Sequence, residues 1–71
     1  MKEYAVVYEW ANTNYSAYVP DLPGCTSTGE TLEEIQKNIT EAIQIYLDEL
    51  REDGLPLPEP TTHVSMVQVA A

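Results

Sequence analysis

The longest regular pattern in the sequence is an amphipathic helix, and it limits what the rest of the chain can form. Thr31 and Glu34 make a T-x-x-E capping box, in which each side chain satisfies a backbone N–H that the helix start leaves without a partner. Gly54 suits the position just after a helix, and Pro56 prevents its continuation. The sequence therefore predicts a helix over residues 32–53, roughly 33 Å long at about 1.5 Å per residue.

One face of this predicted helix is apolar, so a second layer of structure is needed to cover it. Its apolar residues recur at steps of three and four positions, which places them in one stripe. Such a stripe is typical of a helix that lies against a sheet. The side chains expected on this buried face are Leu32, Ile35, Ile39, Ala42, Ile43, Tyr46, Leu47 and Leu50.

Two runs before the helix alternate along the chain and are rich in aromatic and β-branched residues. They span residues 4–10 and 15–19, and this alternation is typical of strands. Asn12-Thr13-Asn14 lies between them, and asparagine tolerates the left-handed backbone angles of tight turns. Pro20 ends the second run because proline has no N–H to donate to a strand ladder. The sequence predicts an antiparallel hairpin with a short loop.

Shorter segments complete the predicted fold. Residues 20–24 are a rigid connector with two prolines, and residues 25–28 are a third strand that ends at Gly29. Residues 55–60 carry proline at every second position, which is typical of a stiff, extended linker. Residues 64–69 are predicted to be a last strand. The fold class is therefore α+β, with the order β-β-β-α-β: one domain in which one long helix covers one face of a small antiparallel sheet.

The charge balance limits the partners that the chain can have. Twelve acidic residues face three basic ones, for a formal net charge of -9. Such a surface repels nucleic acids and anionic membranes, because their binding depends on Lys and Arg, whereas it attracts basic partners. Simple solubility is the alternative explanation, since acidic surfaces are common. Under either interpretation we expect no direct binding to nucleic acid or membrane.

The single cysteine and the lack of long apolar segments point to the cytoplasm. Cys25 has no second cysteine for an internal disulfide, and a lone thiol fits a reducing compartment. No apolar run approaches the roughly 20 residues that span a bilayer. Residues 1–8 lack the pattern of a signal peptide. We expect a cytoplasmic protein.

The sequence contains no recognisable set of catalytic or metal-binding residues. His63 is the only histidine, and Cys25 has neither a CxxC partner nor a basic neighbour that would lower its pKa. Glu9 and Asp21 could in principle hold Mg²⁺ together, but their spacing gives no indication that they meet. We therefore predict a protein that is not an enzyme and that has no catalytic residue, no cofactor and no metal.

The outward face of the predicted helix is strongly acidic and is the first candidate partner-binding surface. Four acidic residues recur there at helical spacing, with Lys37 and Arg51 to one side. Ile45 falls among them, outside the apolar stripe, and would anchor a basic partner that the carboxylates attract. A single exposed apolar residue is also ordinary on a soluble protein, so both interpretations stand. The predicted site consists of Glu34, Glu41, Ile45, Asp48 and Glu52.

The predicted last strand is a second candidate surface. It has apolar residues on both of its faces, and an uncovered apolar strand pairs readily with another chain. A chain this short buries only about 60% of its unfolded surface, so self-association would supply core that it lacks. We expect a homodimer or a higher oligomer. The residues concerned are Val64, Met66, Val67 and Val69.

Three motifs, in this order, resemble the HicB-like antitoxin family over almost the whole chain. The first and most specific is YSAYVPDLPGC at residues 15–25. The second is TGETLEE at residues 28–34, and the third is LREDG at residues 50–54, followed by two spaced prolines.

The resemblance implies a partial ribonuclease-H-like fold without catalytic activity. Members of the family pair with a small, basic, HicA-like toxin of double-stranded-RNA-binding-domain fold that cleaves messenger RNA. They neutralise this toxin by covering its active site, as the antitoxin of a type II toxin-antitoxin system. Many members also carry a C-terminal helix-turn-helix or ribbon-helix-helix module. This chain stops at Ala71, so we expect no autorepression by this chain alone.

The sequence thus favours an antitoxin-like protein that binds and masks a small basic ribonuclease toxin. A degenerate Mg²⁺-dependent ribonuclease-H-like hydrolase is one alternative, and it would require Glu9 and Asp21 to converge. A solitary oligomeric binding or scaffold domain without a toxin partner is the other. A short basic open reading frame beside the gene would favour the antitoxin over the solitary domain.

Overall fold

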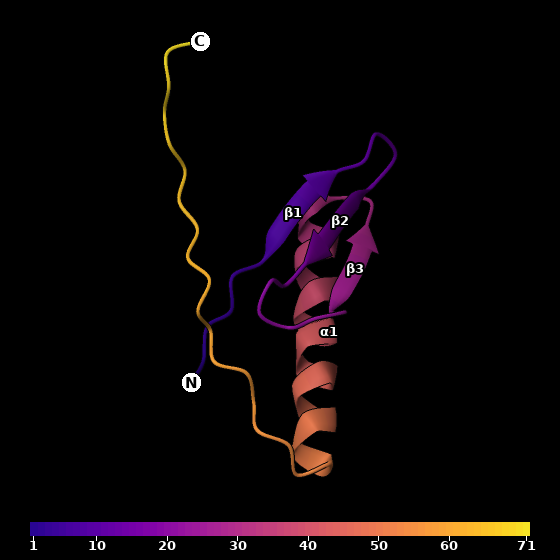
Figure 1. The fold of residues 1–71 in the computed structure, drawn as a ribbon. Coiled ribbons are helices and arrows are strands. Elements are labelled where there is room, and N and C mark those ends of the chain that lie inside the picture. The colour runs from indigo at the N-terminus through magenta and orange to yellow at the C-terminus, as the bar shows by residue number, and fades with distance from the viewer.

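The computed structural model describes residues 1–71 and consists of one small sheet and one long helix (Figure 1). The strands are β1 (Val7–Trp10), β2 (Tyr15–Tyr18) and β3 (Thr26–Gly29), and they lie in the order β1-β2-β3. Both neighbouring pairs are antiparallel. The helix is α1 (Leu32–Glu52), and it packs on the sheet. The predicted α+β class, with an antiparallel sheet and one long helix, is confirmed.

The β1–β2 hairpin closes through the predicted asparagine turn. The N–H of Ala11 donates to the carbonyl oxygen of Asn14 at 2.8 Å, and Asn12 has a φ of 70°. Apart from glycine, asparagine is among the residues that adopt this left-handed conformation most readily. Strand β1 begins at Val7, so it is shorter than the predicted run over residues 4–10.

Both ends of α1 are formed by the residues that the sequence indicated. The N–H of Glu34 donates to Oγ1 of Thr31 at 3.1 Å, and the N–H of Glu30 donates to Oε1 of Glu34 at 3.4 Å. At the other end Gly54 has a φ of 68°, and its N–H donates to the carbonyl oxygen of Arg51 at 3.1 Å. Glycine adopts this left-handed conformation without a Cβ clash, which lets the chain leave the helix. This single helix is too polar to cross a membrane.

The core lies between β2, α1 and the connector that follows β2. In the connector the N–H of Leu22 donates to the carbonyl oxygen of Val19, and the N–H of Cys25 donates to that of Leu22, both at 3.0 Å. These turns carry Leu22 into the core, where it is fully buried. The connector therefore contributes to the packing as well as joining two strands. The buried apolar residues are Ala17, Val19, Leu22, Cys25, Ile35 and Ile39.

The close approach of β3 to α1 depends on Gly29. A Cβ atom at this position would lie 2.8 Å from the backbone nitrogen of Ile35 and 3.2 Å from its Cβ. Atoms at such distances repel, and a backbone nitrogen within a helix cannot move aside as a flexible side chain can. Gly29 is the last residue of β3 and remains paired with Tyr15, so it permits helix packing at the end of the strand.

The apolar stripe of α1 is buried in its middle and exposed at its start. Ile35 and Ile39 are buried, and four further predicted residues pack partly against the core. Leu50 is half-buried. Leu32 is 49% exposed, so its prediction as a buried residue is wrong. It is the first residue of α1 and lies at the end of the apolar stripe.

The helix packs against β3 and β2 and leaves β1 uncovered. The register pairs Tyr8 with Ala17 and Trp10 with Tyr15. Directly paired residues point to the same face, and Ala17 lies in the core, so Tyr8 and Trp10 share the face on which α1 packs. A helix about 10 Å wide covers roughly two strands spaced about 4.8 Å apart. Tyr8 and Trp10 therefore remain 36% and 55% exposed.

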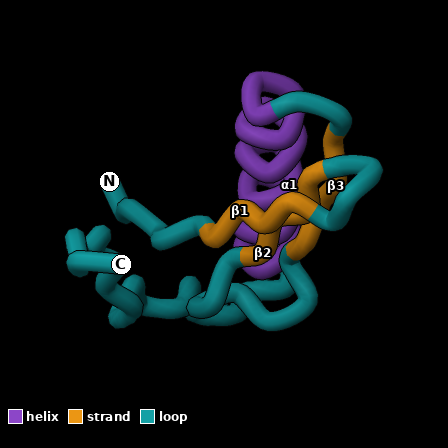
Figure 2. The backbone as a smooth tube through the Cα atoms, turned by 90° about the horizontal axis from the view of Figure 1, so that it is seen from above, coloured by secondary structure: helices purple, strands orange, loops and turns teal.

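The C-terminal part of the chain is extended and contains no strand. The linker at residues 55–60 leads to residues 64–69, which were predicted to form a last strand and do not form one in the single chain. Figures 1 and 2 show this segment leaving to one side of the sheet and the helix. A strand requires a neighbour for its N–H and C=O groups, and no backbone hydrogen bond reaches residues 64–69.

Candidate partner-binding surfaces

The outward face of α1 presents the five predicted contact residues to solvent, and all five are exposed. Two of its carboxylates already have partners within the chain. Glu34 belongs to the N-terminal cap, and Oδ1 of Asp48 lies 3.1 Å from Nη1 of Arg51. Neither of the chain's two ion pairs includes Glu41 or Glu52. These two carboxylates are therefore the least compensated charges of the predicted site.

Few positive charges are available to offset this acidic face. Lys2 pairs with Glu59 at 2.8 Å, and Arg51 pairs with Asp48 within α1. Lys37 is the one remaining basic side chain. Exposed charges act over about 8 Å at physiological salt, so neighbouring carboxylates on one helix face reinforce each other. This surface is suited to attract a cationic partner in a salt-dependent way.

Ile45 lies at the edge of the acidic face and not at its centre. It is 59% exposed and lines a shallow groove of about 240 Å³ between α1 and the start of β3. The other residues of the groove combine small or apolar side chains with one carboxylate. They are Gly24, Cys25, Thr26, Ala42, Tyr46 and Glu49. Ile45 therefore belongs to a small concave surface that could receive an apolar side chain of a partner.

Strand β1 carries an aromatic surface that the sequence pattern did not reveal as exposed. Trp10 is 55% exposed, and its ring centroid lies 4.8 Å from that of Tyr15, with the ring planes at 59°. Tyr8 lies two residues earlier on the same face. Alternation alone predicted a strand here and did not say which of its side chains a second layer would cover. The signal for their exposure was the width of a single helix, which is too small to cover three strands.

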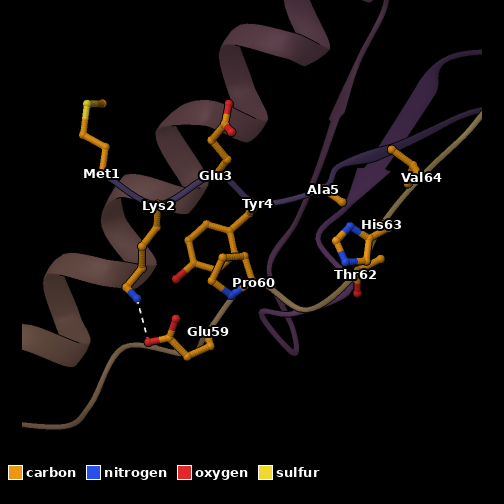
Figure 3. Close-up of a pocket in the computed structure, with 10 residues that line it drawn as sticks. All are labelled: Met1, Lys2, Glu3, Tyr4, Ala5, Glu59, Pro60, Thr62, His63 and Val64. Carbon is orange, nitrogen blue, oxygen red and sulfur yellow. Dashed lines mark hydrogen bonds and ion pairs between the residues drawn. The ribbon is translucent and has the colours of Figure 1, made fainter.

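A second groove lies between the N-terminal residues and the C-terminal segment (Figure 3). It has a volume of about 610 Å³ and lies beside two contacts that join the ends of the chain. The hydroxyl of Tyr4 donates to the carbonyl oxygen of Pro58 at 2.6 Å, and Nζ of Lys2 donates to Oε1 of Glu59 at 2.8 Å. His63 and Val64 line its other end. These contacts hold the linker beside the N-terminal residues.

Asp21 fixes the point at which the C-terminal segment departs. Its carboxylate accepts hydrogen bonds from the backbone N–H groups and the hydroxyls of Thr61 and Thr62, at 3.0 to 3.2 Å. These bonds, led by that from the backbone of Thr62, lower the pKa of Asp21 below its usual value. Both oxygens of this carboxylate are therefore occupied. We call this arrangement of Asp21, Thr61 and Thr62 the Asp21 clamp.

The residues that sequence reasoning weighed for chemistry do not come together. Glu9 pairs across the sheet with Ser16, whereas Asp21 belongs to the clamp. No group of three or more His, Cys, Asp and Glu side chains could hold a metal ion. Cys25 is buried in the core, and this burial raises the pKa of its thiol, which disfavours the reactive thiolate. His63 is exposed and lines the groove between the N-terminal residues and the C-terminal segment.

Comparison with known protein families gives a match over nearly the whole chain. The family described as "HicB_like antitoxin of bacterial toxin-antitoxin system" matches residues 4–70. A UPF0150 protein of Helicobacter pylori is 38% identical over 65 residues, which cover 90% of each chain.

Two further relatives are matched over a smaller share of their length. An uncharacterized 14.9 kDa protein of Haemophilus phage HP1 is 41% identical over 56 residues, which cover 79% of this chain and 42% of the phage protein. A UPF0150 protein of Synechocystis is 47% identical over 45 residues, which cover 63% of this chain and 57% of that protein. The chain thus spans about half the length of these two relatives.

Among solved structures, a chain of the HicA3 and HicB3 toxin-antitoxin complex has a similar fold. The TM-score is 0.71, and the sequences are 32% identical. The match covers 84% of this chain and 70% of the chain in the complex.

Proposed function

The chain belongs to the HicB-like antitoxin family, and we propose that it acts as an antitoxin by binding and masking a small, basic, HicA-like toxin that cleaves messenger RNA. The observation that carries the proposal is the likeness, at 32% identity and a TM-score of 0.71, to a chain of a solved toxin-antitoxin complex. The family's printed description as an antitoxin of a bacterial toxin-antitoxin system supports the same role.

The charge of the chain supports a basic protein as its partner. The formal net charge of -9 favours encounter with a positively charged surface, and two of the three basic side chains are already paired internally. A ribonuclease that holds RNA needs a positive surface to bind phosphates. An acidic protein that covers this surface would compete with RNA for the same charges, which is a physical route to inhibition.

The outward face of α1 is the proposed contact surface for this toxin. Glu41 and Glu52 supply uncompensated negative charge, and Ile45 with its groove supplies a place for an apolar side chain. Charge at the rim of an interface mainly accelerates association, whereas burial at its centre slows dissociation. We therefore expect Glu41 and Glu52 to affect mainly the association rate constant and Ile45 to affect mainly the dissociation rate constant.

The role of α1 can be tested with variants that reverse its charge. Replacing Glu41 and Asp48 by Lys should slow association with the toxin and weaken its dependence on salt. The double variant should bind roughly tenfold or more weakly at low salt. Replacing Glu3 and Glu9 by Lys is the matched control, because it makes the same change in net charge away from α1. Equal association rates for the α1 double variant and the wild type would reject α1 as the contact surface.

The function itself can be tested with the product of a short basic open reading frame beside the gene. The two proteins should form a stable complex of defined stoichiometry after purification. RNA cleavage by the basic protein should stop once the chain is present in equal amount. If the basic protein does not cleave RNA, or cleaves it equally well with the chain bound, the antitoxin proposal is wrong.

We also propose that the chain catalyses no reaction and that it acts in the cytoplasm with the toxin. Its carboxylates form no metal-binding group, and Cys25 is buried. Hydrolysis of RNA by the purified chain with Mg²⁺, in the absence of any partner, would contradict the non-catalytic role. We further propose that the fold is a partial ribonuclease-H-like fold, as the family resemblance implies.

A further inference from the structure

The C-terminal segment contains a strand-like sequence that has no hydrogen-bonded partner in the chain. Val64, Met66, Val67 and Val69 are 66 to 99% exposed. No residue after Thr62 makes a hydrogen bond within the chain. β-branched residues dominate these positions, and residues 64–69 contain no charge, proline or glycine. A segment of this composition forms a strand readily when an edge is available.

The same chain also offers a free edge. Strand β1 lies at the end of the sheet and pairs only with β2. Helix α1 does not cover it, so Tyr8 and Trp10 remain exposed on the helix side. A strand added beside β1 would satisfy its unpaired backbone groups and place side chains next to both aromatic rings.

From these two features we propose that residues 64–69 pair as a strand with the β1 edge of a second copy of the chain. Two copies would exchange their C-terminal segments about a twofold axis. Each copy has one unpaired segment and one unpaired edge, so a pair of copies satisfies both at once and closes the assembly. This inference concerns self-association and does not depend on the toxin proposal.

The side chains of the segment suit a position at this edge. Val64 and Met66 alternate with Val67 and Val69, so apolar groups project from both sides of the extended segment. Beside β1, one side would lie next to Tyr8 on the helix face of the sheet. The other side would share the opposite face. A segment that is apolar on both sides gains from a place where both are covered.

The charges distinguish a second copy from a basic partner at this surface. Residues 64–69 carry no charge, and Glu9 is the only charged residue of β1. A basic toxin would gain little attraction here, whereas the outward face of α1 offers it several carboxylates. Two copies of a chain with a net charge of -9 repel each other least where their charge density is lowest. The β1 edge is such a surface.

The path of the chain favours a second copy over the edge of the same molecule. The Asp21 clamp holds Thr61 and Thr62, and beyond it the segment leaves the sheet (Figure 1). The longest dimension of the molecule is 48 Å, and its radius of gyration is 13.8 Å. A compact domain of this length would have a radius of gyration of about 11 Å. The fixed departure and the extended path present the segment to a neighbouring molecule.

Light scattering and hydrogen exchange of the full chain test this proposal together. We expect a mass of two chains and slow amide exchange in both β1 and residues 64–69. Val67→Lys should place a charge in the exchanged strand, raise the dissociation constant more than about tenfold and restore fast exchange at both sites. Ile45→Lys, on α1, is the matched control and should remain a dimer. Circular dichroism should show an unchanged helix signal in Val67→Lys, since Val67 lies outside the core.

Several outcomes would overturn the proposal. A monomer with protected residues 64–69 would mean that the segment pairs with the β1 edge of its own chain. A monomer in which the segment is unprotected, and becomes protected only when a basic partner is added, would assign the surface to that partner. A dimer that Val67→Lys leaves intact, with residues 64–69 in fast exchange, would place the contact elsewhere.

Discussion

The half of the molecule built from β2, β3 and α1 differs from the half that contains β1 and the C-terminal segment. All six buried apolar residues lie between Ala17 and Ile39, and caps and turns define the ends of their elements. By contrast, β1 and residues 64–69 expose most of their large apolar side chains. The first half is complete within one chain. In the second half, the outer edge of β1 and all of residues 64–69 lack the neighbouring strand that their composition favours.

The largest effect should come from removing a core side chain of the first half. Ile39 is 1% exposed and packs between α1 and the sheet. Ile39→Ala should lower the free energy of unfolding by about 2 to 5 kcal/mol, through lost burial and the cavity that remains. For a domain of this size such a loss removes much of the total stability. Urea unfolding followed by the helix signal measures it.

Val69→Ala provides the matched test in the second half. Val69 is also a β-branched residue, but it is exposed and lies outside the core. Under conditions in which the chain is monomeric, its replacement should change the free energy of unfolding by less than about 0.5 kcal/mol. If Ile39→Ala and Val69→Ala lower the free energy of unfolding by similar amounts, the C-terminal segment is part of the core and the two halves do not differ in packing.

A smaller effect is expected where the first half is packed most tightly. In Gly29→Ala the new Cβ would meet the backbone nitrogen of Ile35 at 2.8 Å. The helix would have to shift away from β3, at a cost of about 1 to 3 kcal/mol. Ser27→Ala in the same strand adds no such contact and is the control. If both variants unfold at the same urea concentration, α1 does not approach β3 as closely as described.

The sequence predicted the first half well because its signals are local. The capping box at Thr31 and the glycine at position 54 mark the ends of α1, and the asparagine turn marks the hairpin. Each of these depends on residues only a few positions apart. The spacing of Ile35 and Ile39 then identified the buried side of the helix.

The remaining features depend on distant parts of the chain and carried no local signal. Trp10 alternates as a buried strand residue would, yet α1 reaches only two strands, so it is exposed. Asp21 was weighed as a metal ligand, but its partners Thr61 and Thr62 lie 40 and 41 residues away. The composition of residues 64–69 predicted a strand, but composition does not show whether another strand lies beside the segment to pair with it. On the candidate site, sequence periodicity placed Glu41 and Glu52 correctly on the outward face.

The smallest effect on overall stability should come from the Asp21 clamp, which joins the two halves. Asp21→Asn leaves one acceptor oxygen where the carboxylate has two, so Thr61 and Thr62 would lose part of their hydrogen bonding. The residues beyond Thr62 lie outside the core, so the unfolding midpoint should change little. Amide exchange at Thr62 should accelerate instead. Glu59→Gln, which removes the ion pair with Lys2, is the control and should leave Thr62 protected.

The clamp should also respond to acid in a defined direction. Its hydrogen bonds hold the pKa of Asp21 below the usual value of 3.8. The folded state therefore binds this proton less readily than the unfolded state, so the clamp's contribution is fully present above the ordinary pKa. It is lost as the pH falls through the lowered pKa. The amide shifts of Thr61 and Thr62 should titrate together with a midpoint below 3.8. A midpoint at or above that value would mean that the carboxylate is not engaged and that the C-terminal segment is not fixed at its departure.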